Sequence, residues 1–351
     1  AGACLYKTVR HFTDQKIAWI AYGFYFILGG LSAWIMIPYS DSTGIIFPVF
    51  LFWLYVKLKE TESAKKKCVL LFLMFFLCYI GFEIKPMAAI VMIAIVAVEG
   101  IHFAGRLLKK QSVLKKSLLA YCLAAVLGLG VAAGGVSAVV GSMHFPVVTD
   151  TVLGWQHHMM LGLNKDTNGG YSQADFDYST SFSSAEEQHA AELKEIGKRL
   201  KDFGVGGYLQ HFVKKSARNY FDGCFGWGGL GETFYTEIFP ERGTVLCSLI
   251  RSLYYDNTED TLYRYPALFR QILWYMVLVF VPFSVFTKRP LDKKRQVAVL
   301  SVLGLMLYLQ IFEAHARYLY TFVPIFVFLA TEGIDNLREY LNQKSERRVK
   351  K

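Results

Sequence analysis

The stretch WQHHMMLGLN, residues 155–164, with GGY at 169–171, is the most chemically varied part of a polar insert that runs from about 141 to 266. The insert is the only long segment compatible with water, and apolar runs of membrane length flank it on both sides. We therefore expect the apolar segments to form a scaffold that holds this insert over one face of a bilayer.

The composition of the chain excludes an ordinary soluble protein. The mean hydropathy is +0.31, and 54% of the 351 residues are hydrophobic. A chain of this length and composition needs lipid to cover its apolar surface. We therefore predict an integral plasma-membrane protein that crosses the bilayer several times.

Eight apolar runs are suited to cross a bilayer as helices, at 17–38, 45–56, 69–84, 87–104, 118–140, 268–286, 297–312 and 318–334. The predicted fold class is all-α integral membrane, with about eight transmembrane helices and one large, mostly helical extracytoplasmic insert. The divisions are 1–140 with five helices, 141–266 as the insert, 267–335 with three helices and 336–351 as a basic cytoplasmic tail. Gly130 and Gly134 in the fifth run predict close approach of a neighbouring helix.

The distribution of charge predicts the orientation. Under this topology one side carries 24 of the 38 Lys and Arg residues but only 9 of the 28 Asp and Glu residues. Such an excess of basic residues marks the cytoplasmic side. We therefore expect both ends of the chain in the cytoplasm and the insert outside. Because the net charge of +10 has this explanation, nucleic acid is not an expected partner.

The insert carries its own helix signals. Ser184 and Glu187 form a capping box, in which each side chain hydrogen-bonds a backbone N–H at the start of a helix. Apolar residues then recur at helical spacing as far as Gly204, which predicts a C-terminal cap. A second helix is predicted over 208–221, and a turn-rich loop over 223–231.

The second predicted helix has one apolar, aromatic face beside basic residues. The face consists of Tyr208, Leu209, Phe212, Val213, Tyr220 and Phe221, and the basic residues are Lys214, Lys215 and Arg218. Such a helix suits a membrane surface, where rings enter the headgroup layer and cations meet phosphate. The alternative is an ordinary helix of a small external domain.

The cysteines do not indicate a metal site. The six residues are scattered, without CxxC or Cys/His ligand spacing, so no structural zinc is expected. Cys224 and Cys247 share the insert, so a disulfide between them is one alternative and two free thiols the other.

Charged residues gather at the predicted external turns, which lie at the same interface as the insert. They are Asp41, Lys85, Glu313, His315 and Arg317. Together they could bind a lipid-linked anionic substrate. Each has a simpler alternative: Asp41 could cap a helix, Lys85 could snorkel to lipid phosphate, and Arg317 could pair with Glu313 four residues earlier.

The histidine pair of the insert is a poor metal site, because adjacent side chains on a helix or strand diverge. His157 and His158 are better suited to hydrogen-bond a sugar, with Trp155 as a stacking surface. The alternative is a loop anchored at the interface by its aromatic residues. No metal is expected.

Several short segments together resemble bacterial polytopic glycosyltransferases of the C-type fold, in the group of protein O-mannosyltransferases and aminoarabinose transferases. These segments are PYSDST (38–43), IKP (84–86), residues 155–171, YFDG (220–223) and FEAHARY (312–318). They are spread over most of the chain. The resemblance implies an enzyme that moves one sugar from a polyprenyl-phosphate carrier to an acceptor glycan, lipid or protein at the external face.

The resemblance also implies roles for individual residues. It implies that Lys85 and Arg317, next to Tyr318, lie near the lipid phosphate, and that Trp155, His157 and His158 lie near sugar or acceptor. The lipid-linked sugar is the donor substrate, and no further cofactor is implied.

In that family the carboxylate that deprotonates the acceptor hydroxyl usually lies in a long first external loop. Here the first external turn spans only residues 39–44, so we expect the chain to lack an N-terminal part that carries the base and to be inactive alone. Asp41 is the substitute candidate.

Two other readings remain open. One is a different membrane enzyme or flippase that handles lipid-linked polymer, such as a ligase or polymerase. The other is a non-enzymatic membrane protein whose insert binds a partner. Sugar transfer by the full-length protein would distinguish a glycosyltransferase from both of these alternatives.

Overall fold

The computed structural model describes residues 1–109, 117–143, 153–235, 243–255, 262–286 and 291–349, and within these ranges it is helical without a strand. Before the insert lie α1 (Gly2–Phe12), α2 (Gln15–Tyr25), η1 (Phe26–Gly30), η2 (Ala33–Met36), α3 (Ser40–Gly44), α4 (Ile46–Glu60), α5 (Ala64–Ile84), η3 (Pro86–Ala89), α6 (Ile90–Leu108) and α7 (Leu118–Ser142). The insert contains α8 (Trp155–Gly162), α9 (Gln173–Thr180), α10 (Ala185–Tyr220), α11 (Trp227–Tyr235) and α12 (Val245–Tyr254). After it come α13 (Arg264–Phe280), η4 (Val281–Ser284), α14 (Lys293–Ile311), α15 (Arg317–Tyr320) and α16 (Val323–Val349).

Six stretches of the described chain are long and apolar enough to cross a membrane. They are Ser40–Glu60, Ala64–Ile84, Pro86–Leu108, Leu118–Ser142, Arg264–Ser284 and Lys293–Ile311. These correspond to six of the eight predicted runs, so the prediction of an all-α integral membrane protein is confirmed. The first and the last predicted runs have a different form.

The first predicted run, 17–38, is not one continuous helix. α2 passes into the π-helical turn η1 at Phe26, η1 ends at the pair Gly29–Gly30, and the 3-10 turn η2 follows. Glycines favour such a break because they weaken helix interiors. The freed carbonyls obtain side-chain donors: Tyr320 donates to the carbonyl of Gly29 at 2.8 Å, and Tyr254 donates to that of Leu31 at 3.0 Å. Irregular backbone at membrane depth requires such partners.

The last predicted run, 318–334, forms the centre of the molecule. α15 ends at Tyr320, and α16 begins at Val323 with Pro324 in its first turn, where proline fits a helix. Every residue from Thr321 to Gly333 is buried, with packing contacts from α1, α2, α4, α13 and α14. A helix that is apolar on all faces belongs in such a core. The basic tail continues α16 to Val349, and residues 350–351 lie outside the described part.

The close approach of α5 and α7 is not made at the predicted glycines. A side chain added at Gly130 or Gly134 would meet nothing within 4 Å, whereas one added at Gly128 would meet the carbonyl oxygen of Phe72 on α5 at 2.4 Å. Ala124 and Ala132, one turn to either side, are also buried. The small-residue seam is therefore 124–128–132, four residues apart, and the prediction from Gly130 and Gly134 was wrong in its register.

The helices of the insert begin and kink where the sequence predicts. The side chain of Ser184 accepts a hydrogen bond from the backbone N–H of Glu187 at 3.3 Å. Gly204 has φ +55°, which divides α10 into two helical parts. The predicted loop 223–231 is only partly a loop, because α11 begins at Trp227.

The second half of α10 differs from the predicted interfacial helix in its basic residues. Leu209, Val213 and Phe221 are exposed, as a membrane-facing stripe requires. Lys215, however, is wholly buried, and Arg218 donates inward to the carbonyl of Ala314 at 3.2 Å. Both cations therefore bind backbone carbonyls of the protein, and the buried ammonium of Lys215 is not available to lipid phosphate.

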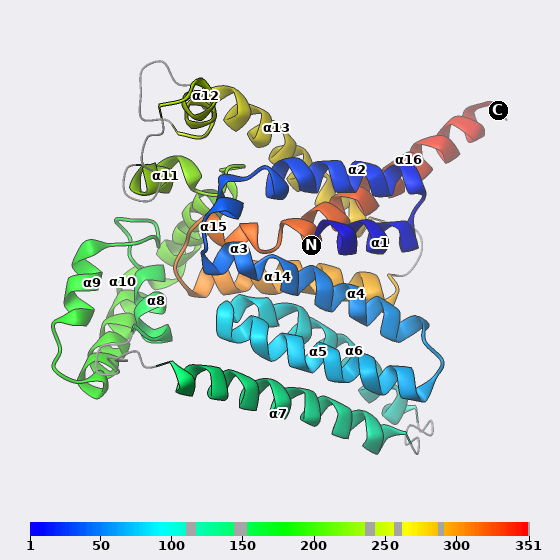
Figure 1. Cartoon of the computed structure of the whole chain (residues 1–351), viewed down its shortest axis with the longest axis horizontal. Coiled ribbons are helices and arrows are strands. Elements are labelled where there is room, and N and C mark those ends of the chain that lie inside the picture. Colours follow the sequence, from blue (N-terminus) through cyan, green and yellow to red (C-terminus); the bar gives the residue numbers. More distant parts are fainter. Residues whose placement is uncertain (110–116, 144–152, 236–242, 256–261, 287–290, 350–351) are drawn as a thin grey trace.

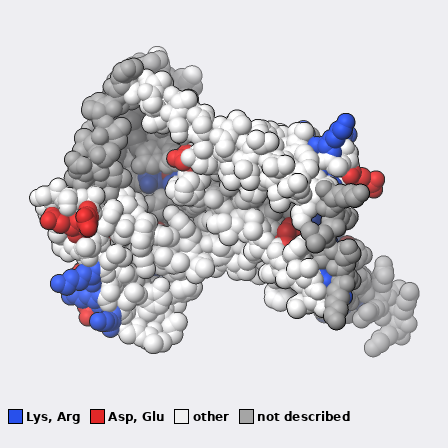
Figure 2. Space-filling view, turned by 90° about the horizontal axis from the view of Figure 1, so that it is seen from below, with Lys and Arg blue, Asp and Glu red and all other residues white. Residues whose placement is uncertain are grey.

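Figure 1 shows how these parts are arranged. Helices α4, α5, α6, α7 and α14 lie side by side across the view, and α8 to α11 gather at one end of them. Figure 2 shows that Lys, Arg, Asp and Glu collect toward the two ends of the visible face, while its middle is largely free of charged residues. A band of this kind is what a protein surrounded by lipid presents.

We predict from the charge distribution that the insert is extracytoplasmic. A membrane-impermeant maleimide applied to intact cells should label Lys198→Cys, an exposed site on α10, and should label Glu62→Cys, between α4 and α5, only after permeabilisation. The unsubstituted protein provides the background from native cysteines. Labelling of position 62 but not of position 198 in intact cells would show the opposite orientation.

Candidate functional site

The candidate site is built around the turn at 312–317, which joins α14 to α15 and carries Glu313, His315 and Arg317. The insert holds this turn directly. The backbone N–H of Ala314 donates to the carbonyl of Gly169 at 2.7 Å. Gly169 has φ +79°, and a side chain there would collide with Lys215, so glycine is required at this contact.

Lys215 on α10 is the strongest link between the insert and this turn. Its ammonium donates to the carbonyls of Gly162 at 2.9 Å, Gln310 at 2.8 Å and Phe312 at 2.7 Å. Gly162 ends α8, and the other two carbonyls lie at the end of α14, where the helix itself leaves them without partners. Burial lowers the pKa of Lys215 to about 7, against the opposing effect of the Glu313 carboxylate. Only the protonated form has one donor for each of the three carbonyls.

Three predicted residues from distant parts of the chain meet at the 312–317 turn. Asp41 on α3 is fully buried, with Lys85 Nζ at 2.7 Å from one carboxylate oxygen and Arg317 Nε at 3.2 Å from the other. We call these three residues the ion cluster. Burial lowers the pKa of Lys85, and the charge and hydrogen bond of Asp41 oppose that shift. The carboxylate therefore fixes two cations side by side, which would otherwise repel one another.

The contacts of the ion cluster differ from the simpler alternative roles given above for Asp41, Lys85 and Arg317. Asp41 does not cap a helix through its side chain, because it lies in the first turn of α3 with its carboxylate turned to the cations. Lys85 points into the protein, and its side chain is 11% exposed. Arg317 pairs with Asp41, whereas Glu313 has other partners.

Aromatic rings surround the two cations. The guanidinium carbon of Arg317 lies 4.6 Å from the ring centroid of Tyr39, 5.6 Å from that of Tyr318 and 5.7 Å from that of Trp34. Lys85 Nζ lies 4.6 Å from the Tyr318 centroid. Contacts of this geometry stabilise a desolvated cation and restrict its motion. The predicted residue Tyr318 is thus part of the site through both cations.

Glu313 is a second carboxylate beside the ion cluster. One of its oxygens accepts a hydrogen bond from the Tyr318 hydroxyl at 2.7 Å and lies 3.5 Å from Nδ1 of His158. Burial raises the pKa of Glu313, but hydrogen bonds from His158 and Tyr318 together outweigh it and hold the pKa below its usual value. The sequence places Glu313 among the charged residues at the external turns, with Arg317 as its alternative partner, and does not indicate its contacts with Tyr318 and His158.

His315 has a positioning role on the same turn. Its Nδ1 accepts the backbone N–H of Arg317 at 3.1 Å, which places the proton of the neutral ring on Nε2. Burial first, and then the charge of Arg317, lowers the pKa of His315 to about 4. His315 is therefore neutral at physiological pH and adds no charge to the cluster.

The three predicted residues on α8 divide between different environments. His158 faces Glu313, as described above. His157 is buried within the insert, where its Nδ1 lies 2.7 Å from the hydroxyl of Ser179 and 3.9 Å from a carboxylate oxygen of Glu192. Trp155 is exposed at the start of α8. The rings of the two histidines lie edge to face with centroids 5.5 Å apart, but only His158 reaches Glu313, whereas His157 has its polar partners within the insert.

An apolar groove with a volume of about 760 Å³ lies beside the ion cluster. One wall is formed by residues 30–33 and 35–37 of the η1–η2 segment, and the other by Trp227 of α11 and by Cys247, Ile250, Arg251, Tyr254 and Tyr255 in and after α12. Trp34 links the groove to the cluster, since its ring contacts Trp227 with centroids 5.1 Å apart and lies under Arg317.

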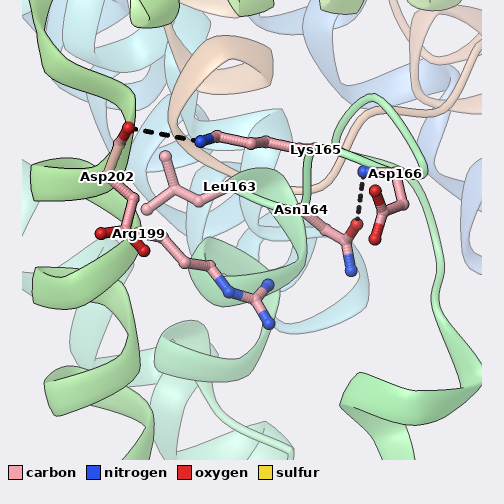
Figure 3. Close-up of a pocket in the computed structure, with 6 residues that line it drawn as sticks. All are labelled: Leu163, Asn164, Lys165, Asp166, Arg199 and Asp202. Carbon is pink, nitrogen blue, oxygen red and sulfur yellow. Dashed lines mark hydrogen bonds between the residues drawn. The ribbon is translucent and has the colours of Figure 1, made fainter.

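A smaller polar pocket of about 200 Å³ lies within the insert (Figure 3). It is lined by Leu163, Asn164, Lys165, Asp166, Arg199 and Asp202. Lys165 donates to the carbonyl of Asp202 at 3.3 Å, and Arg199 makes two hydrogen bonds to Asp175, at 2.7 and 2.9 Å. Because its main cations are engaged in holding α8, α9 and α10 together, we assign this pocket to the stability of the insert.

No group of three or more His, Cys, Asp and Glu residues that could hold a metal ion is present in the described ranges. All six cysteines are free thiols, and Cys224 is buried. The alternative of a disulfide between Cys224 and Cys247 is thus not realised in the structure.

Comparison with known proteins agrees with the membrane fold. The model of a family described as conserved hypothetical integral membrane protein matches residues 6–336, and the chain belongs to this family. No curated protein and no solved structure matches the chain.

We predict that Lys215→Met destabilises the protein. Three buried carbonyls lose this donor, and of these that of Gly162 keeps Nε2 of His211 as a second one. One unsatisfied buried acceptor already costs about 1–3 kcal/mol. The melting temperature of the purified protein should fall by several degrees, whereas Lys214→Met, at the exposed neighbouring position, should leave it unchanged. An unchanged or raised melting temperature for Lys215→Met would mean that the cost of burying the ammonium equals or exceeds the value of its hydrogen bonds.

Proposed function

As a member of this family of integral membrane proteins, the chain presents a cationic site beside an apolar groove, and we propose that it is a glycosyltransferase. It would move one sugar from a polyprenyl-phosphate carrier to an acceptor at the extracytoplasmic face. The observation that carries this proposal is the convergence of Lys85 and Arg317, 232 positions apart in the sequence, on Asp41. The ring of Trp34 lies between Arg317 and Trp227, which lines the groove. A lipid phosphate has the matching chemistry, because it joins an anionic head to an apolar chain.

The two cations are suited to bind the phosphate that leaves. Arg317 uses Nε for Asp41, and its two terminal nitrogens make no hydrogen bond within the described part of the chain. These nitrogens can form a fork to phosphate oxygens, and Lys85 can add a point charge. Asp41 holds both cations in place before substrate arrives, and such preorganisation is the main source of electrostatic catalysis.

The same geometry argues against Asp41 as the catalytic base. Both of its oxygens are sealed from solvent and lie at ion-pair distance from a cation. Glu313 is the better candidate in this chain, because Tyr318 and His158 engage only one of its oxygens and its side chain is 11% exposed, whereas that of Asp41 is fully buried. A carboxylate within reach of the acceptor hydroxyl can accept its proton.

The proposed step conserves atoms and charge. The acceptor oxygen attacks the anomeric carbon of the sugar, and the bond from that carbon to the phosphate oxygen breaks. The proton of the acceptor hydroxyl passes to Glu313 and then to water. Polyprenyl phosphate leaves with one more negative charge than it had as a diester, and Lys85 and Arg317 stabilise that charge.

We expect Arg317→Ala to lower sugar transfer from a polyprenyl-phosphate donor by about tenfold to a few hundredfold. A charge-assisted contact is worth about 1.5–3 kcal/mol, and about 1.4 kcal/mol corresponds to one decade in rate. Arg317→Lys should recover part of the loss, because it keeps the charge but not the fork. Arg264→Ala, an exposed arginine at the start of α13, is the control and should transfer normally. Normal donor kinetics in a stable Arg317→Ala protein would remove the phosphate assignment.

We expect Glu313→Gln to reduce the turnover number far more than the donor KM, since the amide cannot accept the proton. Tyr318→Phe should act differently. It removes a hydrogen bond that lowers the pKa of Glu313, so that pKa rises and activity is lost at a higher pH on the acid side of the profile. The measurement is the pH dependence of transfer by each variant. If Glu313→Gln keeps the turnover and the acid limb of the parent protein, another group is the base.

A further inference from the structure

α12 has an apolar face that the described part of the chain does not cover. Val245, Leu246, Leu249 and Ile250 form one stripe along this short helix, and Val245 is 90% exposed. The opposite side of α12 faces the apolar groove through Cys247, Arg251 and Tyr254, and Ile250 lies at the edge between the two sides. An exposed apolar stripe of this kind requires an apolar environment in the working protein.

The wall of the groove opposite α12, formed by the η1–η2 segment, is also apolar and exposed. On η2, Ile35 and Met36 line the groove and are also exposed, Met36 by 69%. Both rims of the groove are therefore apolar and uncovered, although the two segments lie more than 200 positions apart in the sequence. An exposed apolar residue on one wall alone would be unremarkable, whereas a matched pair of rims indicates one common environment.

The apolar surface of α12 continues onto a membrane span. α12 packs against α13, which belongs to the candidate membrane span Arg264–Ser284. Leu268, Phe269 and Ile272 of α13 are exposed, so lipid must cover them. At the start of α13 the guanidinium of Arg264 lies over the ring of Tyr265, with 5.0 Å between its central carbon and the centroid. Arginine and tyrosine in this position are typical of the headgroup level of a bilayer.

The direction of the α12 axis also agrees with a position at the headgroup level of the bilayer. In Figure 1 α12 is seen almost end-on, whereas α5, α6 and α7 run across the view. α12 therefore lies across the direction of the membrane-crossing helices, as a helix in the plane of a membrane does.

We propose that α12 is an interfacial helix, which lies with its apolar stripe in the outer boundary of the bilayer hydrocarbon, and that η2 dips into the same layer. The groove between them consequently opens to lipid and not to water. A hydrocarbon chain could pass from the leaflet to the groove without crossing water. This inference concerns the position of the two walls and does not depend on the proposed transfer reaction.

The test measures the surroundings of spin labels on the full chain in nanodiscs of phosphatidylcholine. Single cysteines are placed at Leu249 and Met36 on the two rims, in a background in which the native cysteines are replaced by alanine or serine. Ile272→Cys on α13 is the lipid reference, and Lys198→Cys on α10 is the water reference. Val245→Cys serves as a second position on α12, and each variant must melt at the temperature of its unlabelled background.

The expected result is that labels at 249 and 36 resemble the label at 272, with high accessibility to oxygen and low accessibility to a water-soluble nickel complex. Accessibility to nickel equal to that at 198 would show that the rims face water and would overturn the proposal. Low accessibility to both reagents would show that protein, either a second copy or a partner, covers the rims, and would also overturn it. Loss of sugar transfer would leave this result unaffected, so the two proposals can fail separately.

Discussion

The buried ammonium of Lys215 is the interaction on which the candidate site depends. A polar insert of more than a hundred residues has to be fixed to the ends of membrane helices, where the last carbonyls of a helix have no partners of their own. Lys215 supplies donors to the end of α8 and to the end of α14 at once. It therefore joins the insert to the membrane scaffold at the point where the 312–317 turn begins. Arg218 and Gly169 continue this attachment along the turn, and Glu313 and Arg317 project from a backbone that is held on the insert side.

A second constraint comes from the interruption of the first apolar run. A continuous helix over 17–38 would leave no place for the indole of Trp34 under Arg317 or for one wall of the apolar groove. The break at Gly29–Gly30 is stable because Tyr320, Tyr254 and Arg270 donate to the carbonyls that it frees. Two of these donors come from α12, the last helix of the insert, and from α13, the first helix after it. The same contacts that satisfy the irregular backbone thus bring the two walls of the groove together.

The ion cluster shows how charges in a membrane protein can be both stable and available. Asp41 neutralises one of the two cations, so the three residues together keep a single positive charge beside the groove. Rings of Trp34, Tyr39 and Tyr318 replace part of the lost hydration of the cations. Glu313 lies on the same turn as Arg317 but is hydrogen-bonded away from it, to Tyr318. Two carboxylates close together therefore have separate environments, one locked between cations and one partly open.

Composition, run length and charge distribution were enough to determine the fold class, because lipid imposes helices on any segment that crosses it. Local patterns likewise determined the cap at Ser184 and the kink at Gly204, since both depend on neighbours within a few residues. The sequence also placed Asp41, Lys85 and Arg317 at one interface, because short turns between spans have to lie there. Only the tertiary structure decided which of them touch. Three features depend on which face of a helix meets a neighbour: the pairing of Arg317 with Asp41 instead of Glu313, the inward direction of Lys215, and the different partners of His157 and His158. That choice is made by packing between segments far apart in the chain, and a local sequence pattern does not contain it.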